Sequence, residues 1–454
     1  MLDYTKKELT DRKALTINPA KTCQPVGAMY AALGVHNCLP HSHGSQGCCA
    51  FHRMFLTRHF KDPAMASSSS FTEGASVFGG GGNLKTAAKN IFDLYNPDII
   101  AVHTTCLSET IGDDLNAIIT DINIPEGKYM VHCNTPSYAG SHITGFSNMI
   151  SGFVNYLAEK TGISNGKVCV LPGFVNPGDM REYKRLMNLM KVPFVMLPDT
   201  SGVFDSPMTG KYNMYPAGGT TIKDIVSIGD CKKTIALGKI ASEAPAENIR
   251  KKFGVEYTVN MLPMGVEATD NFIMTLQGLS QEEIPYEIEE ERGQLIDMML
   301  DIHPYTSGKT VAIFGDPDTV LGIASFVLEL GMTPKYMITG TPGAAFEQKA
   351  KELLEKYNVS DSVVKASGDL FYLHQLLKNE KTDLIIGGTH GKTMARAEDI
   401  PLVRMGFPII DRYIHSYMPL VGYKGAMRMS ELIANAIMDY QDSHCEEKDL
   451  EMVM

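Results

Sequence analysis

Residues 310–343 read TVAIFGDPDTVLGIASFVLELGMTPKYMITGTPG and carry the clearest structural signal in the chain. The apolar run TVAIFG is followed by a helical pattern up to Leu330, then by Gly331 and a second apolar run. Glycine commonly ends helices because it adopts the left-handed backbone conformation without steric cost. The stretch therefore predicts a strand, a helix and a second strand that runs parallel to the first.

The same order of elements recurs elsewhere in the chain. KVCVLPGFV (167–175) precedes a helical pattern that begins near Pro177, and TDLIIGGTHG (382–391) reads as another strand. Alternating strands and helices predict an α/β fold of doubly wound, Rossmann-like domains with parallel sheets. The expected domains are residues 1–160, residues 161–300 with an acidic helical connector at 282–303, and residues 301–454.

Composition narrows the classes of protein that this chain can belong to. Of the 454 residues, 44% are hydrophobic and 20% are charged, which is typical of globular proteins and excludes rods and wholesale disorder. The net charge of −11 disfavours binding to nucleic acid or anionic membranes, because phosphate attraction requires clustered cations. No apolar run approaches the roughly 20 residues that span a bilayer, and the charged N-terminus lacks an apolar signal core. We expect a soluble, cytoplasmic protein.

The cysteines do not follow a known disulfide or zinc pattern. They number nine and include no CxxC pair, so any metal site must combine distant segments. Cys133, Cys169 and Cys231 lie in apolar patterns and are interpreted as core residues. Cys23 precedes a helix of small residues, and by itself this position favours a structural role.

HSHGSQGCCAFHRMFLTRHF (41–60) is the most informative motif. Gly44 allows a tight backbone path, and the pattern after it predicts a helix with Cys48 near its N-terminus. The helix dipole there favours a thiolate, which is the form that binds iron. The alternative is that Cys48 and Cys49 are small buried residues, and spacing alone supports the two interpretations equally. If one of them is a ligand, Cys48 is favoured because it directly follows the glycine turn.

Two further candidates follow predicted strands. NPDIIAVHTTC (96–106) delivers Cys106 to a strand end, and a helix containing Asp113 is expected after it. KYMVHCNTPSYAGSH (128–142) delivers Ser137 in the same way. Because ligands bind beyond the carboxyl ends of parallel strands, we expect these two residues on neighbouring loops at one sheet edge.

Three other groups of residues indicate alternative sites. Six histidines near these cysteines could form a zinc hydrolase site, but no HExxH pattern occurs. They are His36, His41, His43, His52, His59 and His103.

Neither GGTHGKT (387–393) nor VFGGGGN (77–83) completes a phosphate-binding loop, so we expect no nucleotide site. We interpret the four glycines as an exposed loop. Asp297 and Asp301 share a helical face and could hold a hard cation or could form a solvated acidic face.

Seven ordered motifs together resemble the beta chains of nitrogenase molybdenum–iron proteins over essentially the whole sequence. They are KTCQPVGAMYAALG, HSHGSQGCC, FTEGASVFGG, HTTCLSETIGDDL, NTPSYAGSHITGF, IEEERGQLIDMM and FPIIDRYIHSYMPLVGYKGA. The resemblance implies a heterotetramer of two alpha and two beta chains, with an 8Fe-7S P-cluster shared at each alpha–beta interface. It also implies docking of an ATP-hydrolysing iron protein, and an iron–molybdenum cofactor, held in the alpha chain alone, at which N2 is reduced to ammonia.

The resemblance assigns roles to individual residues. The implied P-cluster ligands are Cys23, Cys48 and Cys106, joined by Ser137 when the cluster is oxidised. The implied metal ligands between two beta chains are Asp62 from one copy and Asp297 and Asp301 from the other, with Ca2+ or Fe2+ as the ion. Asp62 stands where the better-known pattern has Glu, which weakens that site. Phe78 matches an aromatic residue that contacts the iron protein, and Phe51 stands where Tyr is frequent.

Two other classes of function stay open at this point. A cofactor-assembly scaffold would share the fold and an iron–sulfur interface without reducing dinitrogen. The presence of all three cysteines together with Ser137 argues against it, because a scaffold cluster has simpler ligation. A histidine-based metal hydrolase would contain no iron–sulfur cluster, so iron analysis and visible absorbance would distinguish it.

Overall fold

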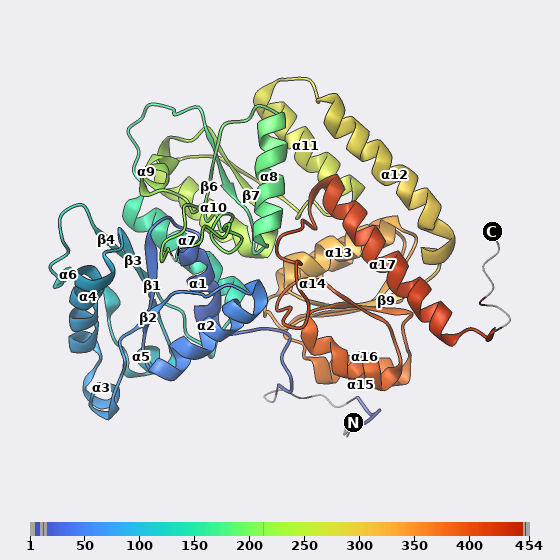
Figure 1. Cartoon of the computed structure of the whole chain (residues 1–454), viewed down its shortest axis with the longest axis horizontal. Coiled ribbons are helices and arrows are strands. Elements are labelled where there is room, and N and C mark those ends of the chain that lie inside the picture. Colours follow the sequence, from blue (N-terminus) through green and yellow to red (C-terminus); the bar gives the residue numbers. More distant parts are fainter. Residues whose placement is uncertain (1–4, 10–11, 13–15, 212, 448–449, 451–454) are drawn as a thin grey trace. The chain divides into compact units, whose positions relative to one another are not determined.

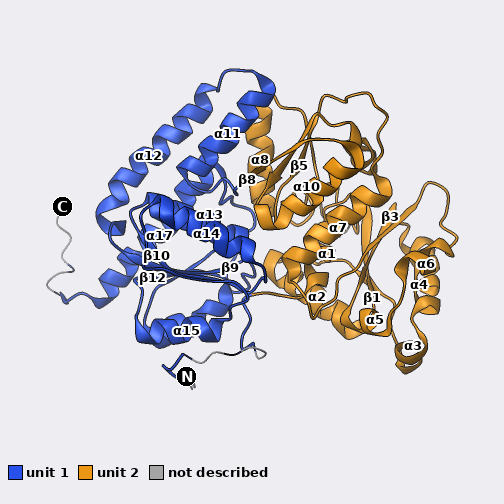
Figure 2. Ribbon diagram, turned by 180° about the vertical axis from the view of Figure 1, so that it is seen from behind, with its two compact units in different colours: residues 1–20, 261–454 blue, residues 21–260 orange. Residues whose placement is uncertain are grey.

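The computed structural model describes residues 5–9, 12, 16–211, 213–447 and 450, so most of the charged N-terminal stretch 1–15 lies outside the described residues. The chain forms two compact units (Figure 2), one of residues 21–260 and one of residues 1–20 with 261–454. The described strands form three sheets, and every strand pair in them is parallel. The α/β fold with parallel sheets is therefore confirmed, whereas the division into three domains stays a prediction.

The unit of residues 21–260 contains two four-stranded sheets (Figure 1). The first has the order β2-β1-β3-β4, and its strands are β1 (Cys38–His43), β2 (Ser67–Ser68), β3 (Ile99–Thr104) and β4 (Tyr129–Cys133). Its helices are α1 (Gln24–Leu33), α2 (Gln46–Phe60), α3 (Glu73–Phe78), α4 (Gly81–Tyr95), α5 (Cys106–Ile111), α6 (Leu115–Thr120) and α7 (His142–Leu157). Leu84 and Ile91 of α4 pack with Ile100 and Val102 of β3 in a buried cluster.

The second sheet of this unit has the order β6-β5-β7-β8. Its strands are β5 (Val168–Leu171), β6 (Phe194–Met196), β7 (Lys233–Leu237) and β8 (Tyr257–Asn260), with helices α8 (Pro177–Leu189), α9 (Ile222–Val226) and α10 (Lys239–Phe253). Pro177 occupies the first turn of α8, where its missing N–H costs no hydrogen bond. The strand and helix expected from residue 167 onward are thus present.

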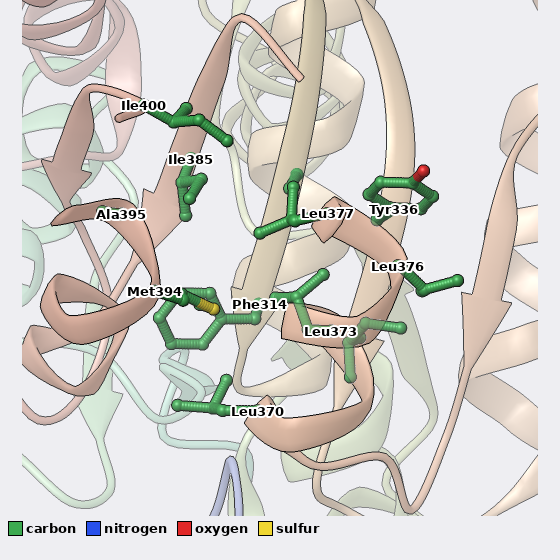
Figure 3. Close-up of a cluster of buried hydrophobic side chains, with 12 residues drawn as sticks. Phe314, Tyr336, Leu370, Leu373, Leu376, Leu377, Ile385, Met394, Ala395 and Ile400 are labelled. Carbon is green, nitrogen blue, oxygen red and sulfur yellow. The ribbon is translucent and has the colours of Figure 1, made fainter. Parts of the chain in front are cut away.

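The other unit contains a five-stranded sheet of order β11-β10-β9-β12-β13. Its strands are β9 (Thr310–Gly315), β10 (Thr333–Thr339), β11 (Val363–Lys365), β12 (Leu384–Gly387) and β13 (Leu402–Arg404). Its helices are α11 (Val266–Ser280), α12 (Tyr286–Thr306), α13 (Pro317–Glu329), α14 (Ala344–Lys356), α15 (Leu370–Asn379), α16 (Lys392–Glu398) and α17 (Gly422–His444). Phe314 of β9, Leu373 of α15 and Met394 of α16 meet in a buried cluster (Figure 3).

Gly331 ends a helix as its position in the sequence predicts. It has a φ of +74°, and its N–H donates to Leu328 O while that of Met332 donates to Val327 O. These two bonds satisfy carbonyls that the end of α13 leaves free, and they turn the chain directly into β10.

Two local expectations are wrong. Asp113 lies between α5 and α6 rather than inside a helix, because Gly112 adopts a φ of +79° and ends α5. The four-glycine run is only half a loop: Gly79 and Gly80 precede α4, but Gly81 and Gly82 form its first turn. No helix among the described residues is long and apolar enough to cross a membrane.

Candidate metal centre

The carboxyl ends of three adjacent strands carry the candidate ligands of the N-terminal sheet. β1 lies beside β3 and β3 lies beside β4, all in parallel, so the segments that follow them emerge at one edge. Cys106 is the first residue of α5 after β3, and Ser137 lies in the loop after β4. The expected neighbouring positions of these two loops are therefore present.

The three candidate cysteines lie at the N-termini of three helices. Cys23 is the N-cap residue of α1, Cys48 lies in the first turn of α2, and Cys106 begins α5. A helix N-terminus carries partial positive charge, which favours a thiolate or another anionic group. Each of the three cysteines therefore lies at a helix N-terminus, where a sulfur ligand is favoured.

A close approach of two helices sets Cys23 beside the Ser137 loop. α1 and α7 lie side by side (Figure 1). A Cβ on Gly27 of α1 would lie 1.7 Å from the carbonyl oxygen of His142, and one on Gly145 of α7 would lie 1.9 Å from the carbonyl oxygen of Gln24. Only glycine at both positions permits this crossing. As a result, the Ser137 side chain lies close enough to the Cys23 thiol to lower its pKa.

A second close approach brings α2 and α5 together. A Cβ on Gly44 would lie 2.0 Å from Thr105 Oγ1, so this glycine lets the chain after β1 pass directly over the start of α5. The hydroxyls of Thr105 and Ser108 donate to the carbonyl oxygen of His43 at 3.2 and 2.8 Å. Cys48 consequently interacts with Cys106, and it also lies close enough to act on Cys23.

Exposure separates the candidate ligands from most of the other cysteines. Cys23, Cys48 and Cys106 are partly exposed, whereas the Cys49 side chain is buried and its thiol donates to the carbonyl oxygen of Ser67 at 3.4 Å. The other buried cysteines are Cys38, Cys133, Cys169 and Cys231, and Cys445 after α17 is partly exposed. The core interpretation of Cys133, Cys169 and Cys231 is confirmed.

Burial opposes ionisation of two of the candidate thiols, those of Cys23 and Cys106. It raises the pKa of Cys23 to about 11, with a further contribution from Cys48 and an opposing one from the Ser137 hydrogen bond. Burial and then Cys48 also raise the pKa of Cys106. Bound iron reverses this balance, because a coordinating thiol gives up its proton. The donor set therefore fits a cationic iron–sulfur group better than it fits isolated thiolates.

The thiols gather without forming a site for a single ion. Among the residues that the structure describes, no three His, Cys, Asp or Glu side chains converge closely enough to hold a single metal ion. Cys48 acts on the pKa of both Cys23 and Cys106, so the three thiols lie near one another. Iron–sulfur clusters are held by thiolates of this kind.

The histidines of the motif are buried, and His41, His43 and His59 make side-chain hydrogen bonds, whereas His52 Nδ1 has no hydrogen-bond partner among the described residues. Both ring nitrogens of His41 contact serine hydroxyls, and those of His43 contact Ser69 and Asp113. Burial lowers the pKa of His41 to about 3 and that of His52 to about 4. With both nitrogens occupied, His41 and His43 have no lone pair to offer a metal in this arrangement.

A set of side-chain hydrogen bonds near the candidate ligands was not predicted from the sequence. The Asn148 amide donates to Gln24 Oε1 at 3.2 Å and to the carbonyl oxygen of Asn134 at 3.1 Å. The Asn134 amide in turn donates to Glu109 Oε1 at 2.9 Å. These bonds join α7, α1, the β4 loop and α5. The one available signal was Gln24, a buried polar residue in an otherwise apolar helix.

The remaining candidates lie elsewhere on the surface. Asp62 follows α2 and is half-buried, and burial followed by Asp205 raises its pKa. Asp297 and Asp301 are exposed one turn apart on α12, in the other unit. Phe78, the last residue of α3, is 91% exposed, and Phe51 of α2 is 45% exposed. The cation site and the Phe78 contact stay predictions.

Comparison with known proteins places these features in a family. A sequence profile of the "Nitrogenase component 1 type Oxidoreductase" family matches residues 23–438. The chain belongs to this nitrogenase family. A nitrogenase molybdenum–iron protein beta chain of Clostridium pasteurianum is 59% identical over 100% of both chains. Beta chains of the same name are 41% identical in a Nostoc species (97% of this chain, 87% of that one) and 39% identical in Methanococcus maripaludis (95% and 96%).

Solved nitrogenase structures agree with this membership. A chain of "Nitrogenase Cp1 at pH 6.5" is 59% identical, covers 100% of both chains and superposes with a TM-score of 0.98. A chain of "Nitrogenase Cp1 at pH 5" is 16% identical over 97% of this chain and 93% of that one, with a TM-score of 0.69, and it shares the fold alone. This nitrogenase-family chain is thus an oxidoreductase component of nitrogen fixation.

Proposed function

We propose that this chain is the beta subunit of a molybdenum–iron dinitrogenase and holds half of an 8Fe-7S P-cluster shared with an alpha chain. The observation that carries the proposal is the proximity of Cys23, Cys48 and Cys106, each at a helix N-terminus, with Ser137 beside Cys23. When bound, the P-cluster relays electrons from the ATP-dependent iron protein toward the iron–molybdenum cofactor of the alpha chain, where N2 is reduced to ammonia.

The residues of this chain have distinct tasks in that role. The three thiols supply sulfur ligands, and the helix N-termini stabilise the negative charge of those ligands. Ser137 keeps its hydroxyl proton beside Cys23 until oxidation favours an alkoxide ligand. The three cysteines are partly exposed, which leaves their thiols accessible to a cluster shared with an alpha chain.

Two surfaces complete the proposal. Phe78 contacts the iron protein, and its almost complete exposure at the end of α3 supports this role. Asp62 of one beta chain and Asp297 and Asp301 of another hold Ca2+ or Fe2+ between the two alpha–beta halves of a cytoplasmic heterotetramer. The position of Asp297 and Asp301 on one exposed face of α12 supports this site.

Replacement of Cys106 tests the cluster assignment directly. In the complex purified with its alpha chain, Cys106→Ala removes an iron ligand, so we expect lower iron content and altered P-cluster electron paramagnetic resonance. Cys169→Ala is the matched control, because Cys169 is fully buried in β5 and its loss costs packing of about 1–2 kcal/mol without loss of iron. Full iron content and an unaltered P-cluster signal in Cys106→Ala would contradict the assignment.

A further inference from the structure

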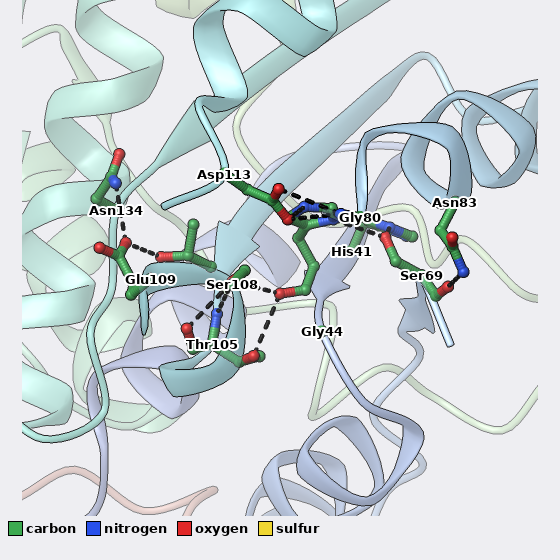
Figure 4. A network of polar contacts seen from close by, with 12 residues as sticks. His41, Gly44, Ser69, Gly80, Asn83, Thr105, Ser108, Glu109, Asp113 and Asn134 are labelled. Carbon is green, nitrogen blue, oxygen red and sulfur yellow. Dashed lines mark hydrogen bonds and ion pairs between the residues drawn. The ribbon is translucent and has the colours of Figure 1, made fainter. Parts of the chain in front are cut away.

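A continuous chain of buried hydrogen bonds crosses the N-terminal sheet beside the candidate ligands. Asp113 Oδ2 contacts His43 Nε2 at 3.0 Å, and His43 Nδ1 contacts Ser69 Oγ at 2.8 Å. Ser69 Oγ contacts His41 Nε2 at 2.8 Å, and His41 Nδ1 contacts Ser67 Oγ at 2.9 Å. We call these five residues the polar chain, and Figure 4 shows its labelled members Asp113, Ser69 and His41.

One set of directions satisfies every bond in the polar chain. Burial lowers the pKa of both histidines, which favours neutral rings with one donor nitrogen and one acceptor nitrogen. With an Asp113 oxygen as the acceptor, His43 donates from Nε2 and accepts at Nδ1 from the Ser69 hydroxyl. Ser69 then accepts from His41, which accepts from Ser67. Every proton points toward Asp113, so a break at one member leaves its neighbours without their partners.

One end of the polar chain anchors the loop that follows Phe78. The N–H of Gly80 donates to both carboxylate oxygens of Asp113, at 3.2 and 3.0 Å. A Cβ on Gly80 would lie 2.0 Å from the Phe71 ring, and the edge of the His43 ring packs on the same ring at a centroid distance of 4.9 Å. The loop therefore rests on Asp113 and Phe71, and both contact His43.

The other contacts of the polar chain lead to two ligand-bearing helices. The carbonyl oxygen of His43 accepts from Thr105 and Ser108, which cap the N-terminus of α5 at Cys106. The carbonyl oxygen of Ser67 accepts from the thiol of Cys49, the neighbour of Cys48 in α2. Both helix N-termini are thus bonded to members of the same chain.

We propose that the polar chain is a positioning unit that couples the loop after Phe78 to the N-termini of α2 and α5. A protein that presses on Phe78 shifts Gly80 against Asp113, and the directed hydrogen bonds carry this shift to the helices that bear Cys48 and Cys106. This inference rests on the proposed function in one respect, because it takes the iron protein as the partner at Phe78. None of the five residues is itself a ligand; they act through the elements that they hold.

Hydrogen–deuterium exchange of the cluster-loaded complex, with and without iron protein, tests the coupling. In the native protein we expect severalfold slower exchange in residues 77–83 when the iron protein binds, and also in the first turns of α2 and α5. Ser69→Ala breaks the polar chain at its centre without removing a ring or a charge. In this variant the loop should still be protected on binding, whereas the effect at α2 and α5 should disappear.

Three further variants make the test specific. Ser70→Ala is the matched control: its hydroxyl donates to the Ser68 carbonyl oxygen at 3.4 Å, outside the polar chain, so it should behave as the native protein does. Ser69→Thr keeps the hydroxyl and should restore the effect at both helices. Asp113→Ala removes both oxygens that accept from His43 and Gly80, so it breaks the far end, should abolish the effect at both helices as Ser69→Ala does, and supplies the answer if Ser69→Ala does not fold.

The outcomes separate this inference from the proposed function. Loop protection without any change at α2 and α5 in the native protein overturns the coupling and leaves docking intact. Native-like coupling in both Ser69→Ala and Asp113→Ala also overturns it. If the iron protein protects no part of residues 77–83 in the native protein, the docking role of Phe78 fails first and the inference fails with it.

Discussion

Ser137 differs from the cysteines in when it can bind iron. A protonated hydroxyl is a poor ligand, whereas its alkoxide binds oxidised iron well, and the Ser137 side chain lies close enough to Cys23 to lower the pKa of that thiol. We therefore expect Ser137→Ala to leave the reduced cluster nearly intact and to change mainly its two-electron-oxidised form. Electron paramagnetic resonance of the oxidised complex checks this. An unchanged oxidised signal would count against a ligand role for Ser137.

Glu329 gives stability a pH dependence that is independent of the metal site. Its carboxylate accepts from the N–H groups of Val266 and Glu267 at 2.7 and 3.0 Å, yet burial raises its pKa to about 7. An unfolded Glu titrates near pH 4.3, so the folded state holds more protons between these two pKa values. The Glu329 contribution to the free energy of unfolding is therefore complete below the lower value and is lost as pH rises through about 7.

Replacement by glutamine tests this sign. Between pH 4.5 and 7.5, Glu329→Gln should lack a decline in unfolding free energy of about 3 kcal/mol that the native protein shows. Denaturant titrations at several pH values measure it. Glu352→Gln is the control, because Glu352 is an exposed partner of Lys349. A decline of equal size in Glu329→Gln and in the native protein would exclude Glu329 as its source.

At the scale of elements, the crossing of α1 and α7 makes a sharp prediction. Gly27→Ala places a methyl group against the backbone of His142, so we expect a loss of about 3 kcal/mol or more of stability despite the better helix propensity of alanine. Gly278→Ala in α11 is the matched control: no atom lies within 4 Å of its Cβ position, and it should gain roughly 0.5–1 kcal/mol. Thermal unfolding of the two variants tests this prediction. Equal midpoints for Gly27→Ala and Gly278→Ala would refute the claim that the crossing of α1 and α7 requires glycine at position 27.

The elements themselves could be predicted from the sequence where the signal is local. Gly331 ends α13 and Pro177 starts α8 because both residues act through their own backbone. Cys48 near a helix N-terminus follows from the same local reasoning. The position of Asp113 outside a helix was missed because Gly112 ends α5 early, and one glycine inside a helical pattern is an ambiguous signal.

The position of Cys23 beside Ser137 was beyond sequence reasoning for a physical reason. Cys23 comes to Ser137 because Gly27 and Gly145 let two helices cross, and those glycines are more than 100 residues apart in the sequence. Nothing in the local pattern around Cys23 reports such a contact, and local reasoning alone assigned it a structural role. The resemblance to a family implies that Cys23 is a ligand. The packing of α1 against α7 explains how Cys23 comes to lie beside Ser137.

At the scale of the whole molecule, the acidic face of α12 predicts how complexes associate. Asp297 and Asp301 repel one another and their copies unless a cation lies among them. Asp297→Asn combined with Asp301→Asn should loosen the tetramer toward alpha–beta halves, as should a chelator, while the P-cluster signal stays unchanged. Light scattering measures the size of the complex.

A second pair on the same helix provides the control. Glu289→Gln combined with Glu290→Gln changes the charge of exposed α12 positions by the same amount, and it should leave the tetramer intact. Asp62 has one methylene fewer than the Glu of the related pattern, so we expect the ion to exchange readily. If neither the double Asn variant nor the chelator changes the size of the complex, Asp297 and Asp301 form a solvated acidic face and do not hold a structural ion.

The two compact units also differ in how their sequences are laid out. Residues 21–260 form one unit as an uninterrupted stretch, whereas residues 1–20 belong with 261–454. During synthesis the first unit can therefore close while the ribosome is still translating the rest of the chain, and the first 20 residues must wait for their partners. All four candidate ligands lie in the early unit. The half-site for the cluster can thus be in place on the nascent chain before the last sheet exists.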